Sequence, residues 1–211
     1  MCRVALVVIA KEPLPGKAKT RLSPPCTPDE AATLAEAALL DTLDVVARTP
    51  THRRVLVLDG SPRRWRRPGL DVIPQRGVGL GERLAAAFED VAEPALLVGM
   101  DTPQLTPRLL LDGMRALASP DVDAVLGPAV DGGYWTVGLK RGGSEAFAGV
   151  PMSCAATWTS QRARLRELGL FVHDHPPLRD VDTIEDARLV ARAAPGSRFA
   201  SSLAAITALA A

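Results

Sequence analysis

The residues best suited to chemistry begin with a basic cluster near the start of the chain. Lys17, Lys19 and Arg21 lie within the five residues that follow Gly16. Glycine lets the backbone approach a ligand closely, and cationic side chains form charge-assisted hydrogen bonds with phosphate oxygens. The segment is not a Walker loop, because Ala18 follows Gly16-Lys17 and the earlier glycine is missing. It predicts a phosphate-binding loop, with an ordinary basic surface loop as the alternative.

Carboxylates at two later places are candidates for holding a metal ion. Asp101 directly follows the apolar stretch 95–100, and Asp180 and Asp182 stand two residues apart. Alternate residues of an extended chain point the same way, so Asp180 and Asp182 can address one ion. Mg²⁺ (or Mn²⁺), which binds through a few carboxylates plus substrate phosphates, is the expected cofactor. Turn and helix-capping duties are the alternative for Asp101 and for one of the late pair.

Two glycine-rich segments are candidates for substrate contacts. The first is expected to contact a base or ribose at a helix start, and the second to form part of an acceptor site. Their candidate residues are Gln75, Gly79, Gly81, Arg83, Gly132, Gly133 and Tyr134. Asp131, an acid beside aromatic rings, is the candidate general base. The alternative for the second segment is a tight turn only.

Alternating strand-like and helix-like stretches must position these residues. Residues 3–10 form an apolar run typical of a buried strand, and Thr27-Pro28-Asp29-Glu30 predicts the capped start of a helix over 28–48. Further strands are expected at 55–59, 70–73, 95–100, 123–126, 134–139 and 171–175, and further helices at 82–91, 106–117, 156–168 and 183–193. This order predicts an α/β fold of three layers, α/β/α, with a mostly parallel sheet that binds ligands at the carboxyl ends of its strands.

Length and composition limit the class of protein. The 211 residues are expected to form a single domain, 1–211. Residues 196–211 are expected to form an Ala-rich helix that packs loosely, either on its own domain or on a partner subunit. The sequence therefore leaves open whether the protein forms a homo-oligomer. Lys plus Arg number 25 and Asp plus Glu 24, so the net charge is +1 and no nucleic-acid partner is expected. The apolar run near the start is too short to span a membrane, and the three scattered cysteines fit a cytoplasmic protein.

Five segments together resemble a bacterial family of glycosyltransferase-A-like transferases, some of them called radical-SAM/selenodomain-associated transferases. The segments are AKEPLPGKAKTRL (10–22), QRGVGLGERLAAAF (75–88), GMDTPQL (99–105), LGPAVDGGYWTVGL (126–139) and LRDVDTIEDA (178–187). More distantly, the chain is similar to the guanylyltransferases of cofactor F420 and molybdopterin synthesis. The resemblance implies a glycosyltransferase-A or nucleotidyltransferase-like fold, with Asp101 as the metal acid and Lys19 and Arg21 in the phosphate-binding loop.

The resemblance and the residues together lead to three functional hypotheses. The first is glycosyl transfer from a nucleotide sugar to a small-molecule acceptor, with Asp131 as base and with Lys19 and Arg21 stabilising the leaving group. The second is nucleotidyl transfer from a nucleoside triphosphate to a phosphorylated acceptor, with pyrophosphate release. The third is a non-catalytic nucleotide-binding protein, because Gly79 stands where the family pattern has an acid and Met152 where it has Trp.

Overall fold

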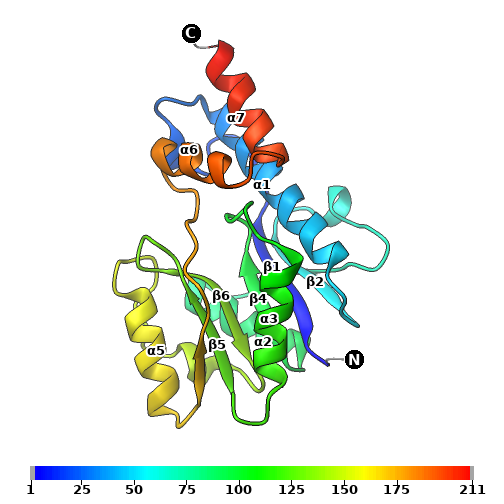
Figure 1. Cartoon of the computed structure of the whole chain (residues 1–211), viewed down its shortest axis with the longest axis vertical. Helices are drawn as coiled ribbons and strands as arrows, with labels where there is room; N and C mark the ends of the chain where they lie inside the picture. The colour runs from blue at the N-terminus through cyan, green and yellow to red at the C-terminus, as the bar shows by residue number, and fades with distance from the viewer. Residues whose placement is uncertain (1–2, 210–211) are drawn as a thin grey trace.

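The computed structural model describes residues 3–209 and contains a seven-stranded sheet as the middle of three layers (Figure 1). The strands are β1 (Ala5–Lys11), β2 (Arg54–Asp59), β3 (Asp71–Pro74), β4 (Ala95–Gly99), β5 (Ala124–Pro128), β6 (Tyr134–Leu139) and β7 (Val172–Asp174). Their order is β3-β2-β1-β4-β6-β5-β7. β6 runs antiparallel to both β4 and β5, and the other neighbouring pairs are parallel. The mostly parallel α/β/α fold expected from the sequence is confirmed.

Helices cover both faces of this sheet. They are α1 (Pro28–Arg48), α2 (Leu80–Val91), α3 (Pro107–Ala118), α4 (Ser144–Phe147), α5 (Thr157–Glu167), α6 (Ile184–Ala193) and α7 (Arg198–Leu209), with short 3₁₀ turns η1 (Thr20–Leu22) and η2 (Pro62–Arg64). Side chains alternate along β1: Leu6 and Val8 pack under α1 and α3, whereas Ala5 and Val7 pack under α2, α4 and α5. This double burial explains the unbroken apolar run of β1.

The start of α1 shows why its boundaries could be predicted. Thr27 accepts a hydrogen bond from the Glu30 backbone N–H, and the Glu30 side chain accepts one from the Thr27 N–H, forming a capping box. In α2 the helix begins at Leu80, two residues before the expected start. Gly79 is therefore the residue that precedes its first turn.

A third group of apolar side chains joins α1 to α6 and α7 at one end of the molecule (Figure 1). Phe199 and Leu203 of α7 are buried there, together with Leu34 of α1 and Val190 of α6. Val181, in the extended segment between β7 and α6, belongs to the same group. The late segment that carries Asp180 and Asp182 is thus anchored by packing on α1.

Within residues 3–209 no helix has the length and apolar character needed to cross a membrane.

Candidate active site

A cleft of about 830 Å³ opens where the carboxyl ends of β1 and β4 meet the amino end of β6. Its volume lies in the range of small-molecule sites. The first turn of α2, the β5–β6 turn, residues 153–157 and the segment before α6 complete its lining. Antiparallel β6 brings its first residue, Tyr134, to the same edge at which β1 and β4 end.

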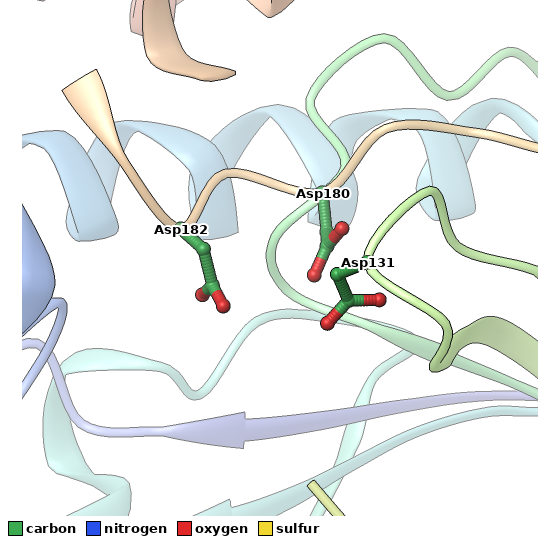
Figure 2. A group of neighbouring side chains, drawn as sticks. All are labelled: Asp131, Asp180 and Asp182. Carbon is green, nitrogen blue, oxygen red and sulfur yellow. The ribbon is translucent and has the colours of Figure 1, made fainter. Parts of the chain in front are cut away.

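Three carboxylates converge at this cleft (Figure 2). Asp131 comes from the β5–β6 turn, whereas Asp180 and Asp182 come from the extended segment before α6. One oxygen of each lies within 4.8 Å of one oxygen of the others. Thr183, and not Asp182, caps α6 by accepting a hydrogen bond from the Asp186 N–H, so Asp182 is available for other contacts.

The electrostatics of this trio favour a bound cation. Burial, and then the charge of Asp131, raise the pKa of Asp180 to about 6, with Asp182 adding to the effect. Like charges held this close disfavour the ionised state of Asp180. A divalent cation between the oxygens removes that penalty, and hard oxygen ligands are those that Mg²⁺ and Mn²⁺ take in proteins.

Lys19 links the first loop to the acids. Its ammonium lies 2.9 Å from Asp101 Oδ2 and 3.5 Å from Asp182 Oδ1, and it donates a hydrogen bond to the Val181 carbonyl. The side chain is only 10% exposed. Burial by itself lowers the pKa of this ammonium, but the neighbouring carboxylates, Asp101 foremost, raise it above its ordinary value. Lys19 therefore contacts carboxylates and does not line the cleft.

Asp101 lines the cleft two residues after Gly99, the last residue of β4, close to the strand end at which the sequence places it. Its Oδ2 is paired with Lys19, and its Oδ1 is buried without a hydrogen-bond partner among residues 3–209. Its backbone carbonyl accepts a hydrogen bond from the Val181 N–H, which holds the late segment against β4. A buried carboxylate oxygen without a donor is costly unless a cation or water satisfies it. The donor set thus fits a divalent ion.

Basic side chains from the first loop face this acidic group. Lys17 and Arg21 both line the cleft, and so does Lys11 at the end of β1. Arg21 Nη1 lies 2.7 Å from Asp182 Oδ2, and its side chain is 70% exposed. Four lining carboxylates would repel a polyphosphate, so these cations need a metal ion beside them to form a favourable phosphate site.

The glycine-rich turn before α2 forms another part of the cleft. Arg83 Nη1 lies 2.8 Å from Asp59 Oδ2 and donates to Gln75 Oε1 at 3.3 Å, while Gln75 Nε2 donates to the Ala10 carbonyl at 2.7 Å. Gln75 and Arg83 are therefore tied to the ends of β1 and β2. Gly79 lines the cleft immediately before α2, where unpaired backbone N–H groups favour an anion or a polar ligand edge.

The turn between β5 and β6 shows why glycine is needed there. Gly132 has φ +92°, and a Cβ on it would lie 2.3 Å from the Ala155 carbonyl oxygen. The Gly132 carbonyl accepts a hydrogen bond from the Trp158 N–H. Asp131 Oδ1 accepts one from the Gly133 N–H at 2.8 Å, which orients the carboxylate. This close approach places residues 153–157 beside the acids.

The structure brings most, but not all, of the residues predicted from the sequence into the cleft lining. Those in the lining are Lys17, Arg21, Gln75, Gly79, Arg83, Asp101, Asp131, Gly133, Tyr134, Asp180 and Asp182. Those outside it are Gly16, Lys19, Gly81 and Gly132. Gly16 is exposed with φ +71°, and Gly81 lies against Met152.

Sequence reasoning also missed residues that the structure places in or next to the cleft. Lys11, Ser153, Cys154, Ala155 and Thr157 belong to its lining. The carboxyl-end rule for parallel strands could have found Lys11, and also Asp59, the partner of Arg83. Residues 153–157 carry no such signal, because they reach the site only through their packing on Gly132.

Comparison with solved structures places this fold among nucleotide-dependent transferases. A candidate nucleotide-diphospho-sugar transferase from Desulfovibrio desulfuricans G20 superposes with a TM-score of 0.85 at 28% identity, covering 97% of this chain and 94% of that one. Rv0371c from Mycobacterium tuberculosis H37Rv, solved in complex with manganese, gives 0.55 at 21% identity, covering 89% and 97%. CMP:2-keto-3-deoxy-manno-octonic acid synthetase complexed with CTP gives 0.53 at 14%, covering 92% and 99%. The last two show a shared fold alone.

At the level of sequence, the comparison with functionally curated proteins gives no match. A family model does match. It is described as an uncharacterized protein conserved in bacteria, DUF2064, and it covers residues 39–154, which is more than half of the chain and includes Asp101, Asp131 and the turn before α2. The chain therefore belongs to the DUF2064 family, with the fold of the nucleotide-diphospho-sugar transferases and nucleotidyltransferases.

Proposed function

We propose that this protein is a divalent-metal-dependent glycosyltransferase that uses a nucleotide sugar as donor and a small molecule as acceptor. One observation carries the proposal: Asp131, Asp180 and Asp182, from two separate segments, converge in a cleft that Lys17 and Arg21 also line. A metal-bridged diphosphate needs this combination of hard oxygen ligands and nearby cations. The likeness to the candidate nucleotide-diphospho-sugar transferase, over almost the whole chain, supports the same class.

In this proposal Asp180 and Asp182 hold Mg²⁺ or Mn²⁺. Asp101 lines the same cleft, and we propose that it contributes its buried, unpartnered Oδ1. A divalent ion bound there neutralises charge that develops on the leaving diphosphate. Lys17 and Arg21, which line the same cleft, bind diphosphate oxygens. Lys19 forms ion pairs with Asp101 and Asp182 and thereby positions these two carboxylates.

Asp131 is the proposed general base. Its Oδ1 is held by the Gly133 N–H, so the second oxygen is free to accept a proton from an acceptor hydroxyl. The acceptor oxygen then forms a bond to the anomeric carbon as the bond from that carbon to the diphosphate breaks. The bonding electrons leave with the nucleoside diphosphate, and the hydroxyl proton stays on Asp131. Since Mg²⁺ binds through only one or two carboxylates in many sites, Asp131 need not be a ligand.

Nucleotidyl transfer is the second candidate function. Three cations, Lys11 at the end of β1 and Lys17 and Arg21 of the first loop, line the cleft, enough to hold a nucleoside triphosphate. CMP:2-keto-3-deoxy-manno-octonic acid synthetase, whose structure contains CTP, has the same fold. Here the α-phosphate is attacked by an acceptor phosphate and pyrophosphate leaves, so no base is required. A non-catalytic nucleotide-binding protein is the outcome if neither product is released.

A product-release assay separates these functions. The protein is incubated with panels of nucleotide sugars and nucleoside triphosphates plus Mg²⁺, with candidate acceptors. Release of nucleoside diphosphate supports glycosyl transfer, and release of pyrophosphate supports nucleotidyl transfer. Asp101→Ala should abolish the signal, whereas Asp112→Ala, on the outer side of α3 where it pairs with Arg115, should leave it unchanged. Wild-type turnover by Asp101→Ala would exclude Asp101 from the metal site.

A second comparison separates ligand from base. Asp131→Asn should keep Mn²⁺ affinity, measured by electron paramagnetic resonance, while losing turnover. Asp180→Asn should lose both. If Asp131→Asn loses Mn²⁺ binding as fully as Asp180→Asn does, Asp131 is a metal ligand and the base must be another group.

The remaining parts of the proposal concern the setting of the protein. We propose that residues 1–211 act as a single transferase domain in the cytoplasm, on small molecules and not on nucleic acid or membranes. α7, the closing helix of that domain, buries Phe199 and Leu203 against α1 and α6. The association with radical-SAM and selenodomain proteins rests on the sequence resemblance alone.

A further inference from the structure

The stretch 178–183, which we call the acidic segment, carries Asp180 and Asp182 but belongs to no helix or regular strand (Figure 2). It begins at the end of β5, where the Leu178 N–H donates to the Pro128 carbonyl at 3.1 Å. It ends at the cap of α6. The ladder bonds that fix a residue inside a sheet are therefore replaced here by individual contacts, and these contacts decide where the two carboxylates lie.

Gln104 makes one of these contacts, immediately before Asp180. Its Nε2 donates a hydrogen bond to the Arg179 carbonyl. A peptide group is planar, so a bond to this oxygen restrains the whole group up to the Cα of Asp180. The next peptide group is held as well, because the Val181 N–H donates to the Asp101 carbonyl at 3.0 Å. Both peptide groups that flank the Asp180 Cα are thus bonded to the loop that follows β4.

Lys19 makes the corresponding contact for Asp182. Its ammonium donates to the Val181 carbonyl, which belongs to the peptide group immediately before Asp182. Each acid therefore follows a peptide oxygen that is bonded to a distant side chain, Gln104 for Asp180 and Lys19 for Asp182. Gln104 is not among the residues that line the cleft, so it acts on the site through the backbone of the acidic segment.

The turn 102–105 gives Gln104 a firm base. The Leu105 N–H donates to the Thr102 carbonyl at 3.0 Å, and the ring of Pro103, at the second position of the turn, fixes its φ. Thr102, Pro103 and Leu105 are all buried. The turn is therefore rigid, and the side chain of Gln104 is presented to the acidic segment in one direction.

Stability alone does not explain an amide at this position. Gln104 Oε1 is buried without a hydrogen-bond partner among residues 3–209. A buried oxygen without a donor costs free energy that offsets much of what the bond from Nε2 contributes. An apolar side chain of similar length would remove that cost, although it would leave the Arg179 carbonyl without its donor. What glutamine supplies is a directional bond to the backbone of the acidic segment.

We infer that Gln104 is a positioning residue for the metal site, and that its bond to Arg179 fixes the place of Asp180 relative to Asp131 and Asp182. The inference rests on the proposed function, in which Asp180 and Asp182 hold the ion, and adds a residue to it. A small divalent ion demands near-ideal ligand geometry, so a displaced carboxylate binds it less tightly. Groups that orient metal ligands typically contribute about 10- to 100-fold to metal affinity.

Gln104→Met tests the inference, with Gln161→Met as the matched control. Gln161 also donates from Nε2 to a backbone carbonyl, that of Ala146 at 2.7 Å, and its side chain is fully buried. It lies on α5, away from the acidic segment in sequence and in element. Both variants lose the same kind of bond, so a general loss of stability would affect the control at least as much.

Two measurements read out the position of the acidic segment. Without metal, hydrogen exchange of the Val181 amide, followed by nuclear magnetic resonance, should speed about tenfold or more in Gln104→Met and keep its rate in Gln161→Met. With metal, the Mn²⁺ dissociation constant, measured by electron paramagnetic resonance, should rise about tenfold or more in Gln104→Met and stay unchanged in Gln161→Met.

Unchanged Val181 exchange in Gln104→Met, or a Mn²⁺ affinity equal to that of the wild type, overturns the inference. Equal losses in Gln161→Met also overturn it, because the effect would then be general loosening. If the wild type binds no Mn²⁺, the proposed metal site fails and this inference fails with it. A failure of the inference alone leaves Mn²⁺ binding by the wild type intact, so the two failures are distinguishable.

Discussion

Removing the charge of Asp180 should make the metal-free protein more stable at neutral pH. The pKa of this carboxyl is raised to about 6 by burial and by Asp131 and Asp182, whereas in the unfolded chain it has the ordinary value of 3.8. A folded-state pKa above the unfolded one means that the native state binds more protons between these two values. Stability contributed by this group is therefore present at acidic pH and is lost as pH rises to about 6.

The size of the effect follows from the shift. A difference of about two pKa units corresponds to about 3 kcal/mol at a pH above both values. Asp180 is partly exposed, and solvent screening reduces this figure to about 1–2 kcal/mol. Asp180→Asn, which keeps the shape and removes the charge, should raise the free energy of unfolding by this amount at pH 8. For a chain of this length the melting temperature should rise by about 2–8 °C.

The assay is chemical and thermal unfolding of wild type and Asp180→Asn at pH 4 and pH 8, in the presence of a chelator. The two proteins should differ at pH 8 and converge at pH 4, where Asp180 is largely protonated in the wild type. Addition of Mg²⁺ or Mn²⁺ should stabilise the wild type more than the variant, since only the wild type retains the full acidic trio.

Asp174→Asn is the matched control with the opposite sign. Hydrogen bonds from Arg162 lower the pKa of Asp174, so its removal should destabilise the protein at pH 8 and have less effect at low pH. If Asp180→Asn is as destabilising as Asp174→Asn at pH 8 without metal, the repulsion within the trio is not the dominant interaction of Asp180. A cation bound at that position would then relieve no repulsion between the acids.

Three further predictions concern the elements that hold the site. Lys19→Met should lower the free energy of unfolding, measured by urea titration, by about 1–3 kcal/mol, because Asp101 and Asp182 lose their shared cation. Addition of Mg²⁺ should restore part of this stability. An unchanged free energy of unfolding would mean that the ion pairs of Lys19 contribute nothing to it. Gly132→Ala should lower the free energy of unfolding by about 1–3 kcal/mol or more, since the added Cβ would clash with Ala155. The same clash should speed the modification of the Cys154 thiol by N-ethylmaleimide. An unchanged melting curve would contradict the close packing of Gly132 on Ala155. Thr27→Ala should cost about 1 kcal/mol through loss of the α1 cap without altering Mn²⁺ affinity, and a change in that affinity would show coupling between α1 and the site.

Much of the fold was encoded locally and could be predicted. The helix 28–48 was expected with the bounds that α1 has, because its capping box, its proline at the first position and its apolar stripe all lie within the helix itself. The strand 134–139 was also expected with the bounds of β6. Its antiparallel direction, and its place between β4 and β5, were not predicted, because strand order depends on pairings between segments far apart in the chain.

For the site, the sequence by itself determined which residue types stand at strand ends. The carboxyl-end rule selected Asp101 and the first loop, and the spacing of Asp180 and Asp182 indicated a shared direction; the structure places all three carboxylates in one cleft. Those inferences needed only local chain geometry and the handedness common to α/β folds.

Only the tertiary structure decided which of these groups meet. Lys19 was expected to bind phosphate, but in the structure its ammonium lies on Asp101 and Asp182, which are both far from it along the chain. Asp131 joins the two late acids, and Cys154 reaches the cleft, through the close approach of Gly132 to the segment before α5. Such contacts depend on how whole layers pack, and neither periodicity nor spacing along one segment contains that information.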